Sequence, residues 1–146
     1  MTTRSYPHPI DPTVTMMEIE PAGHWLTATP SLTPVAPNLM RLDDPVVWRD
    51  SHGKTWTVPA GFITDGASLP WVLTAVWDRW EPRTIQSAVL HDYGYSYHTF
   101  GTKDGVDRRF YDGLVADRWG HALTYYRGVR WFGWYAWSLQ RNVKQG

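Results

Sequence analysis

Proline placement divides this chain into two parts that cannot fold in the same way. Seven of the 11 prolines lie within residues 1–37, and that stretch has no helical periodicity. Because proline lacks an amide hydrogen and has a fixed φ angle, such a stretch builds neither a long helix nor a central strand. We predict an extended proline-rich arm over residues 1–37, bound to a protein partner, and a single α+β domain over residues 38–146.

Length and charge limit the classes of protein to be considered. A chain of 146 residues is long enough for one buried core and too short for two. Its 14 basic and 14 acidic residues cancel, and no long run has one sign, so nucleic-acid binding is disfavoured. The chain has no apolar segment of the ~18 residues needed to span a bilayer and no signal-peptide core, so we expect a soluble protein.

The absence of cysteine restricts the chemistry of any metal site. Without thiolates, a metal can be held only by carboxylates, carbonyl oxygens or imidazoles. Oxygen ligands of this kind favour calcium or magnesium.

Residues 38–70 have the pattern of a β-hairpin followed by a tight loop. Alternating β-branched and aromatic residues at 45–48 and 55–58 flank a glycine-containing turn at 50–54, and another apolar run covers 39–42. In the following loop, Gly61 and Gly66 allow the backbone to approach another backbone or a ligand.

Residues 82–140 are predicted to form a helical core of three helices. The first is expected to begin at Pro82, because proline suits a first turn, and to run to about His98, with Gly101 preventing its continuation. Apolar residues at four-residue intervals predict a second helix over 104–119, capped at Gly120, and a third follows to residue 140. The short first connection predicts two antiparallel helices.

This arrangement directs His91 and Asp92 of the first helix towards Asp107 of the second. A histidine held by a carboxylate through one ring nitrogen keeps the other nitrogen available as a general base. Asp65, in the glycine-flanked loop, supplies another carboxylate, and nearby carbonyl oxygens could complete a cage for a divalent cation. The alternative stays open: His91 and Asp92 cross-link helices, and a carboxylate at a core edge pairs with Arg or Tyr.

The third predicted helix is aromatic on nearly every side. Such a helix packs into a core, touches lipid, or is buried in an assembly. We favour core packing together with an interface. The interface candidates are Tyr125, Tyr126, Trp131, Trp134 and Trp137.

Three segments, residues 58–70, 90–95 and 106–110, resemble an uncharacterised family, a domain of unknown function, of tailed phages and bacteria. In addition, residues 91–95, 106–111 and 125–133 are similar, in order, to three helical motifs of bacterial secreted phospholipase A2. The Thr64–Asp65 loop resembles the calcium loop of those enzymes. Their stabilising disulfides are missing here, and packing by the many tryptophans is expected to replace them.

The second resemblance implies a phospholipase A2-like three-helix core with assigned roles. By this likeness, His91 activates a water molecule and Asp107 orients His91. Asp92, Asp65 and the Gly66 carbonyl hold Ca²⁺, which polarises the ester carbonyl.

Two functions of different classes follow from these patterns. The first is a phage-type calcium-dependent hydrolase that acts on phospholipid or another host envelope ester. The alternative is a non-catalytic virion component of the tail or head, with a vestigial site and its arm bound to a neighbour. A peptidoglycan- or protein-cleaving enzyme ranks last because the His-Glu-x-x-His motif is absent. Either function places the protein in a phage virion or the bacterial host cytoplasm.

Overall fold

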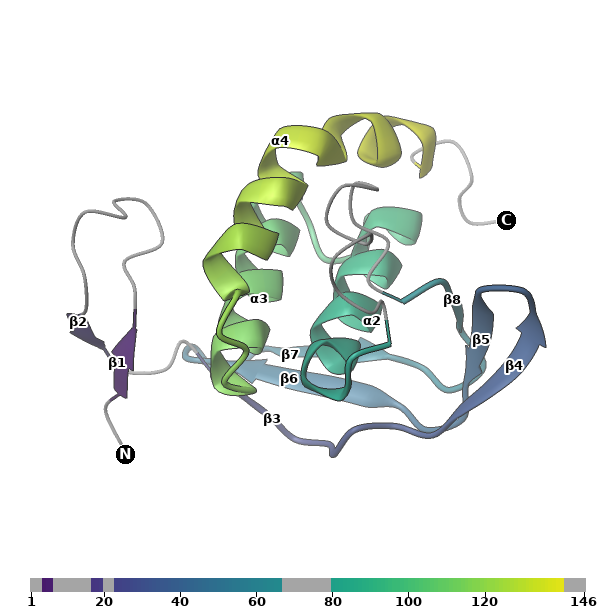
Figure 1. Ribbon diagram of the computed structural model, residues 1–146, viewed down its shortest axis with the longest axis horizontal. Coiled ribbons are helices and arrows are strands. Elements are labelled where there is room, and N and C mark those ends of the chain that lie inside the picture. The colour runs from purple at the N-terminus through teal and green to yellow at the C-terminus, as the bar shows by residue number, and fades with distance from the viewer. Residues whose placement is uncertain (1–3, 7–16, 20–22, 67–79, 141–146) are drawn as a thin grey trace.

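The computed structural model describes residues 4–6, 17–19, 23–66 and 80–140. Within these residues, small antiparallel sheets precede three helices that pack together, so the chain is α+β (Figure 1). The strands are β1 (Arg4–Tyr6), β2 (Met17–Ile19), β3 (Gly23–Trp25), β4 (Leu32–Ala36), β5 (Leu39–Leu42), β6 (Val46–Asp50), β7 (Thr55–Val58) and β8 (Ile63–Thr64). The helices are α2 (Pro82–Tyr97), α3 (Lys103–Ala116) and α4 (Ala122–Gln140).

The predicted hairpin is strands β6 and β7, which pair antiparallel with Trp48 opposite Trp56. Asp50 closes its turn, because its carboxylate accepts the amide hydrogens of His52 and Lys54 and the indole hydrogen of Trp56. The sheets have the orders β3-β6-β7, β4-β5-β8 and β1-β2. The hairpin prediction is therefore confirmed.

Strands β3 and β4 belong to the segment that the sequence predicts as an extended arm. β3 pairs with β6 and β4 pairs with β5. Pro34 is accommodated because β4 is an edge strand and its register shifts between Pro34 and Ala36. The second half of the arm is thus paired with the strands of the domain. Much of the first half, including residues 7–16, lies outside the described residues, as do residues 67–70 of the predicted loop.

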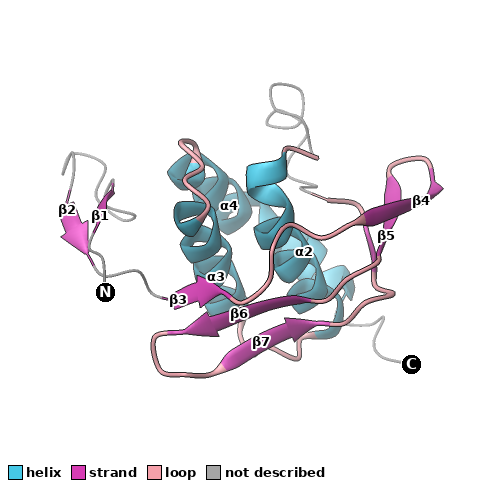
Figure 2. Cartoon of the chain, turned by 90° about the horizontal axis from the view of Figure 1, so that it is seen from below, coloured by secondary structure: helices cyan, strands magenta, loops and turns pink. Residues whose placement is uncertain are grey.

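Helices α2 and α3 cover one face of the β3-β6-β7 sheet (Figure 2). The core at this contact joins β-strand and α2 side chains, namely Leu42, Val46, Trp48, Trp56, Val58, Ile85, Val89 and Leu90. A second cluster joins α3 to α4 through Phe110, Tyr111, Leu114, Trp119, Ala122, Tyr125 and Val129. Helix α3 therefore packs against both α2 and α4, and the candidate site lies where these three helices meet.

Helices α2 and α3 run antiparallel, as their contacts show. Gly94 lies against Val106, and Ser87 lies against Gly113. The residue numbers rise along one helix while they fall along the other, which is the antiparallel order. The connection is short because α2 ends at Tyr97, where His98 caps it with a left-handed φ of 56°. Thr102 already caps α3 by accepting the Gly105 amide hydrogen.

The predicted end of the second helix is wrong by three residues. Helix α3 ends at Ala116 rather than at residue 119. Arg118 takes a left-handed φ of 60°, and the Trp119 amide donates to the Leu114 carbonyl. This bond closes the helix before Gly120, and Trp119 turns into the core.

Candidate functional site

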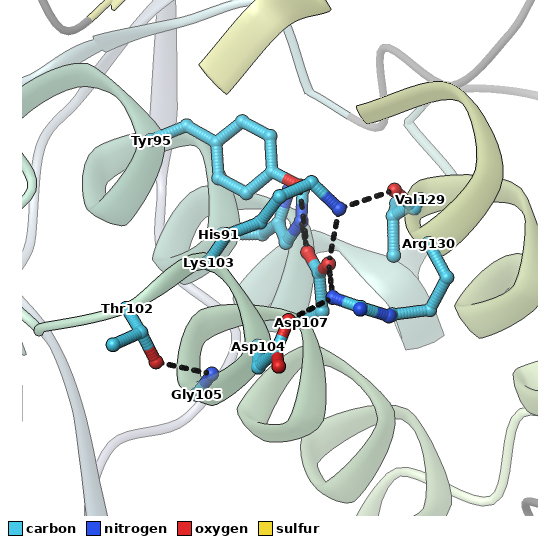
Figure 3. A network of polar contacts seen from close by, with 9 residues as sticks. All are labelled: His91, Tyr95, Thr102, Lys103, Asp104, Gly105, Asp107, Val129 and Arg130. Atoms are coloured by element: carbon cyan, nitrogen blue, oxygen red, sulfur yellow. Dashed lines mark hydrogen bonds and ion pairs between the residues drawn. The ribbon is translucent and has the colours of Figure 1, made fainter. Parts of the chain in front are cut away.

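Asp107 is the centre of a buried polar network (Figure 3). Its carboxylate accepts four hydrogen bonds, two on each oxygen. His91 Nε2 and the Tyr95 hydroxyl donate to Oδ1 at 2.8 and 2.7 Å. Lys103 Nζ and an Arg130 nitrogen donate to Oδ2 at 2.8 and 2.9 Å. The side chain of Asp107 has no exposed surface, so these four donors replace its hydration.

Three helices supply the donors. His91 and Tyr95 lie one turn apart on α2, and Lys103 precedes Asp107 by one turn on α3. Arg130 comes from α4. The predicted hydrogen bond between His91 and Asp107 is present, and it is part of a network that holds α2, α3 and α4 together.

The charge of Asp107 fixes the direction of the bond to His91. Burial raises the pKa of Asp107, but the hydrogen bonds from His91, Lys103 and Tyr95 outweigh burial, so the pKa lies below its ordinary value. An ionised carboxylate only accepts, so His91 Nε2 carries the hydrogen and Nδ1 is the nitrogen left for proton exchange. Burial and then the charge of Asp107 raise the pKa of Tyr95, which keeps its hydroxyl a donor.

His91 is held firmly but is not sealed from solvent. Its side chain is 14% exposed. The imidazole packs between the rings of Tyr95 and Phe110, with centroids 4.1 and 4.7 Å away. Packing and the Asp107 bond together fix the ring orientation, which a general base requires.

Lys103 is a buried lysine, with 2% of its side chain exposed. Besides Asp107, its Nζ donates to the Val129 carbonyl at 3.1 Å and lies 4.7 Å from the Trp134 ring centroid. Arg130 also pairs with Asp104 at 2.7 Å. Two cations therefore face two carboxylates, and this balance offsets the desolvation of the charges.

Helix α4 approaches this network through Gly133, which is buried. A Cβ atom added there would lie 2.4 Å from the Tyr95 hydroxyl and 3.1 Å from Lys103 Cε. Only glycine fits between α4 and these two side chains without displacing one of them.

The predicted metal ligands form a second polar centre. The Thr64 hydroxyl donates to Asp92 Oδ2 at 3.0 Å and accepts the Gly66 amide hydrogen at 3.1 Å. The Asp65 backbone amide also donates to Asp92. Burial, and then the nearby charge of Asp65, raise the pKa of Asp92 to about 7. Asp65 and Asp92 are thus brought together, with Gly66 beside them.

This second centre has fewer ligands than a complete metal cage. Within the described residues, no group of three or more Asp, Glu, His or Cys side chains could hold a metal ion. A cation bound here would take two carboxylates, and its other ligands would be backbone carbonyl oxygens or water.

The family described as "Protein of unknown function (DUF1353)" matches residues 40–136. The chain belongs to this family. The match contains every predicted catalytic and metal-binding residue, from Asp65 to Asp107, and also Arg130. The "Uncharacterized protein y4jT" of Sinorhizobium fredii (strain NBRC 101917 / NGR234) is 29% identical over 127 residues. That match covers 84% of this chain and 35% of y4jT, so the chain spans about a third of this relative. No solved structure matches the chain.

The interface candidates of this DUF1353 chain separate into buried and exposed residues. Tyr125 is 1% exposed and belongs to the core between α3 and α4. Tyr126 and Trp137 are half-buried, and Trp137 stacks on His98. Trp131 and Trp134 are 80% and 55% exposed. Among the described helices, none is long and apolar enough to cross a membrane.

Sequence reasoning missed four contacts of the site: those made by Tyr95, Lys103 and Arg130 to Asp107, and by Thr64 to Asp92. A signal existed for two of them. Tyr95 follows His91 by four residues and Lys103 precedes Asp107 by four, which places each pair on one helical face. Arg130 had no such signal, because its contact depends on how α4 packs on α3.

Proposed function

We propose that this DUF1353 chain is a metal-assisted ester hydrolase in which His91 is the general base. The observation that carries the proposal is the 2.8 Å bond between His91 Nε2 and the buried Asp107 carboxylate. In this arrangement Nδ1 takes a proton from a water molecule, which then attacks the ester carbonyl. Asp107 keeps the imidazole oriented and stabilises its positive charge after the transfer.

Tyr95, Lys103 and Arg130 affect how Asp107 acts on His91. Tyr95 binds the same oxygen as His91 and so holds that side of the carboxylate in place. Lys103 and Arg130 bind the other oxygen and draw negative charge away from His91. His91 is therefore well oriented. The negative charge of Asp107 that stabilises protonated His91 is shared with Lys103 and Arg130, which are bound to the same carboxylate.

Calcium is the metal we propose, held by Asp65, Asp92 and the Gly66 carbonyl. The proximity of the two carboxylates supports a bound cation. The pKa of Asp92 is raised because its charged form is buried beside the charge of Asp65, and a cation between them would offset this repulsion. All the available ligands are oxygens, which suits calcium. When bound, calcium would polarise the scissile carbonyl and stabilise the negative charge that develops on it.

The substrate class comes from the resemblance to bacterial secreted phospholipase A2. Three packed helices, with the histidine on α2 and its aspartate on α3, support that likeness. We therefore propose phospholipid, or another ester of a bacterial envelope, as the substrate of a phage-type enzyme. Binding of the proline-rich arm to a protein partner is part of the same proposal.

One observation favours a second function, that of a non-catalytic virion structural or assembly protein. Each oxygen of Asp107 has two donors, two of the four donors are cations, and the set joins three helices. Such a network has a structural use without any reaction. The His91 bond would then be one cross-link among several.

The test compares ester cleavage by the wild type and His91→Asn on phospholipid vesicles, with calcium and with a chelator. Loss of the general base should lower the rate by about 10²- to 10⁴-fold. His52→Asn is the matched control, because His52 lies in the exposed hairpin turn. Equal rates for the wild type and His91→Asn would remove the catalytic proposal and leave the structural one.

A further inference from the structure

One face of α4 is exposed along most of the helix and carries two tryptophans. We call it the α4 face. Among the α4 residues whose side chains the structure describes, the exposed ones on this face are Thr124, Arg127, Trp131, Trp134 and Ser138. Their three- and four-residue spacing places them on one side of the helix. In Figure 1, α4 lies on the far side of the molecule from β6 and β7, so this face is not part of the contact between helices and sheet.

The exposure of these tryptophans contrasts with the burial of others. Trp48, Trp56 and Trp119 are 0%, 5% and 7% exposed. Trp131, at 80%, leaves most of a large aromatic surface in water, and Trp134 lies one turn further along at 55%. Adjacent exposed aromatics of this size mark a surface that meets a partner.

The charge of the C-terminal region identifies the kind of partner. After Asp117 the chain has five basic residues and no acidic one. Because the whole chain has 14 of each, the first 117 residues hold nine basic and 14 acidic residues. Arg130 is already paired with Asp104 and Asp107, whereas Arg127 lies exposed among the tryptophans.

We propose that the α4 face docks on an anionic lipid bilayer surface. Tryptophan prefers the boundary between water and lipid because its ring is apolar and its N–H is polar. Arginine is attracted to anionic headgroups, and the α4 face carries the exposed Arg127, while helix α4 itself contains no carboxylate. The exposed residues lie along one side of one helix, so they can contact a flat bilayer surface together, as in helices that lie in the membrane interface.

This inference deepens the proposed function by naming the surface on which an envelope ester would be met, but docking itself needs no catalysis. The face is close to the candidate site. The Trp134 ring lies 4.7 Å from Lys103 Nζ, which lies 2.8 Å from the Asp107 carboxylate that holds His91. Three successive contacts therefore connect Trp134, on the α4 face, to His91.

Charge argues against a second copy of the chain as the occupant. In a symmetric dimer built on this face, the same surface meets itself, so each copy would bring an exposed Arg127 and no α4 carboxylate to the contact. Like charges facing each other weaken such an interface.

The experiment measures sedimentation of the full chain with phosphatidylcholine vesicles, made with or without phosphatidylserine, in a chelator that prevents hydrolysis. We expect binding that requires phosphatidylserine and weakens as salt rises. Trp131→Ser should lower the partition coefficient at least about tenfold, the value of burying one large apolar side chain. Trp131 is a cleaner choice than Trp134, which contacts Lys103.

Val35→Ser removes a hydrophobic side chain of 46% exposure on the distant strand β4, and it should leave vesicle binding unchanged. The proposal is overturned if the wild type sediments with neither vesicle or if Trp131→Ser binds as well as the wild type. It is equally overturned if ultracentrifugation shows a dimer that Trp131→Ser abolishes. If the wild type binds vesicles in this assay but cleaves no ester in a parallel assay with calcium, the hydrolase proposal alone is rejected.

Discussion

Asp107 and Asp92 lie on neighbouring helices, and the chain surrounds them in opposite ways. Asp107 receives four donors that include two cations, and its pKa falls below the ordinary value in spite of burial. Asp92 receives hydrogen bonds from Thr64 and the Asp65 amide but lies beside another carboxylate, and its pKa rises to about 7. The charge of Asp107 is therefore balanced by groups of the chain itself. The charge of Asp92 is not, so the second centre is stabilised when Asp92 binds a proton or a cation from solution.

The largest effect is expected from Asp107→Asn. The amide cannot balance the charge of Lys103, which stays buried, so the free energy of unfolding should fall by about 3–5 kcal/mol. Denaturant unfolding measures this change. Asp43→Asn, which alters an exposed ion pair with Arg41, should change it by less than about 1 kcal/mol. Equal effects of the two substitutions would show that the Asp107 network adds no stability.

Calcium should stabilise the wild type through the second centre. A ligand that binds only the folded state at about a hundredfold excess over its Kd adds about 2.7 kcal/mol. Thermal unfolding with and without calcium measures the shift in Tm. Asp65→Asn and Asp92→Asn should remove the shift, while Asp104→Asn, which lies outside the proposed ligand set, should keep it. A wild-type Tm that calcium leaves unchanged would withdraw calcium and leave the His91–Asp107 pair standing.

Gly133→Ala tests how closely α4 is fitted to the first centre. The added methyl group meets the Tyr95 hydroxyl and Lys103, so we expect a loss of about 1–3 kcal/mol in unfolding free energy. Gly105→Ala is the control, since its nearest neighbour is 3.4 Å away and alanine favours a helix. Combining Gly133→Ala with Tyr95→Phe should cost less than the sum of the single changes, because the phenol oxygen that meets the methyl group is gone. Strict additivity would contradict the predicted contact.

The smallest expected effect is a difference in pH dependence between the two centres. The raised pKa of Asp92 means that the folded state binds more protons than the unfolded state between about pH 4 and 7, so stability falls as pH rises through that window. Asp92→Asn should remove that fall and should be more stable than the wild type at neutral pH, because the amide places no charge beside Asp65.

Asp107 has the opposite sign. Its lowered pKa adds stability that is present above the ordinary carboxyl value of 3.8 and is lost as pH falls through the lower, folded value. Denaturant unfolding across the acid range measures both effects. Parallel pH profiles for Asp92→Asn and the wild type would contradict the difference between the centres.

The sequence predicted best what depends on local spacing. The hairpin followed from alternation and its turn, and the His91–Asp107 contact followed from two helices joined by a short connection. The end of α3 was misplaced because Gly120 is the expected cap, whereas Arg118 takes the left-handed conformation.

Contacts between distant elements escaped prediction. Strand β3 has three residues, and its pairing with β6 joins Gly23 to Asp50, so no local pattern reveals it. The role of Arg130 likewise required the packing of α4 on α3. Sequence patterns define which elements form, but the partners of a buried charge depend on the assembled fold.

The order of the donors along the chain has a consequence for synthesis on the ribosome. His91, Tyr95, Lys103 and Asp107 are made before α4, but the Val129 carbonyl and Arg130 that complete their shell come last. A nascent chain released before residue 129 would hold Lys103 and Asp107 without two of their partners. The polar centre can therefore close only after α4 has been translated, so acquisition of the folded site waits for the synthesis of residues 122–140.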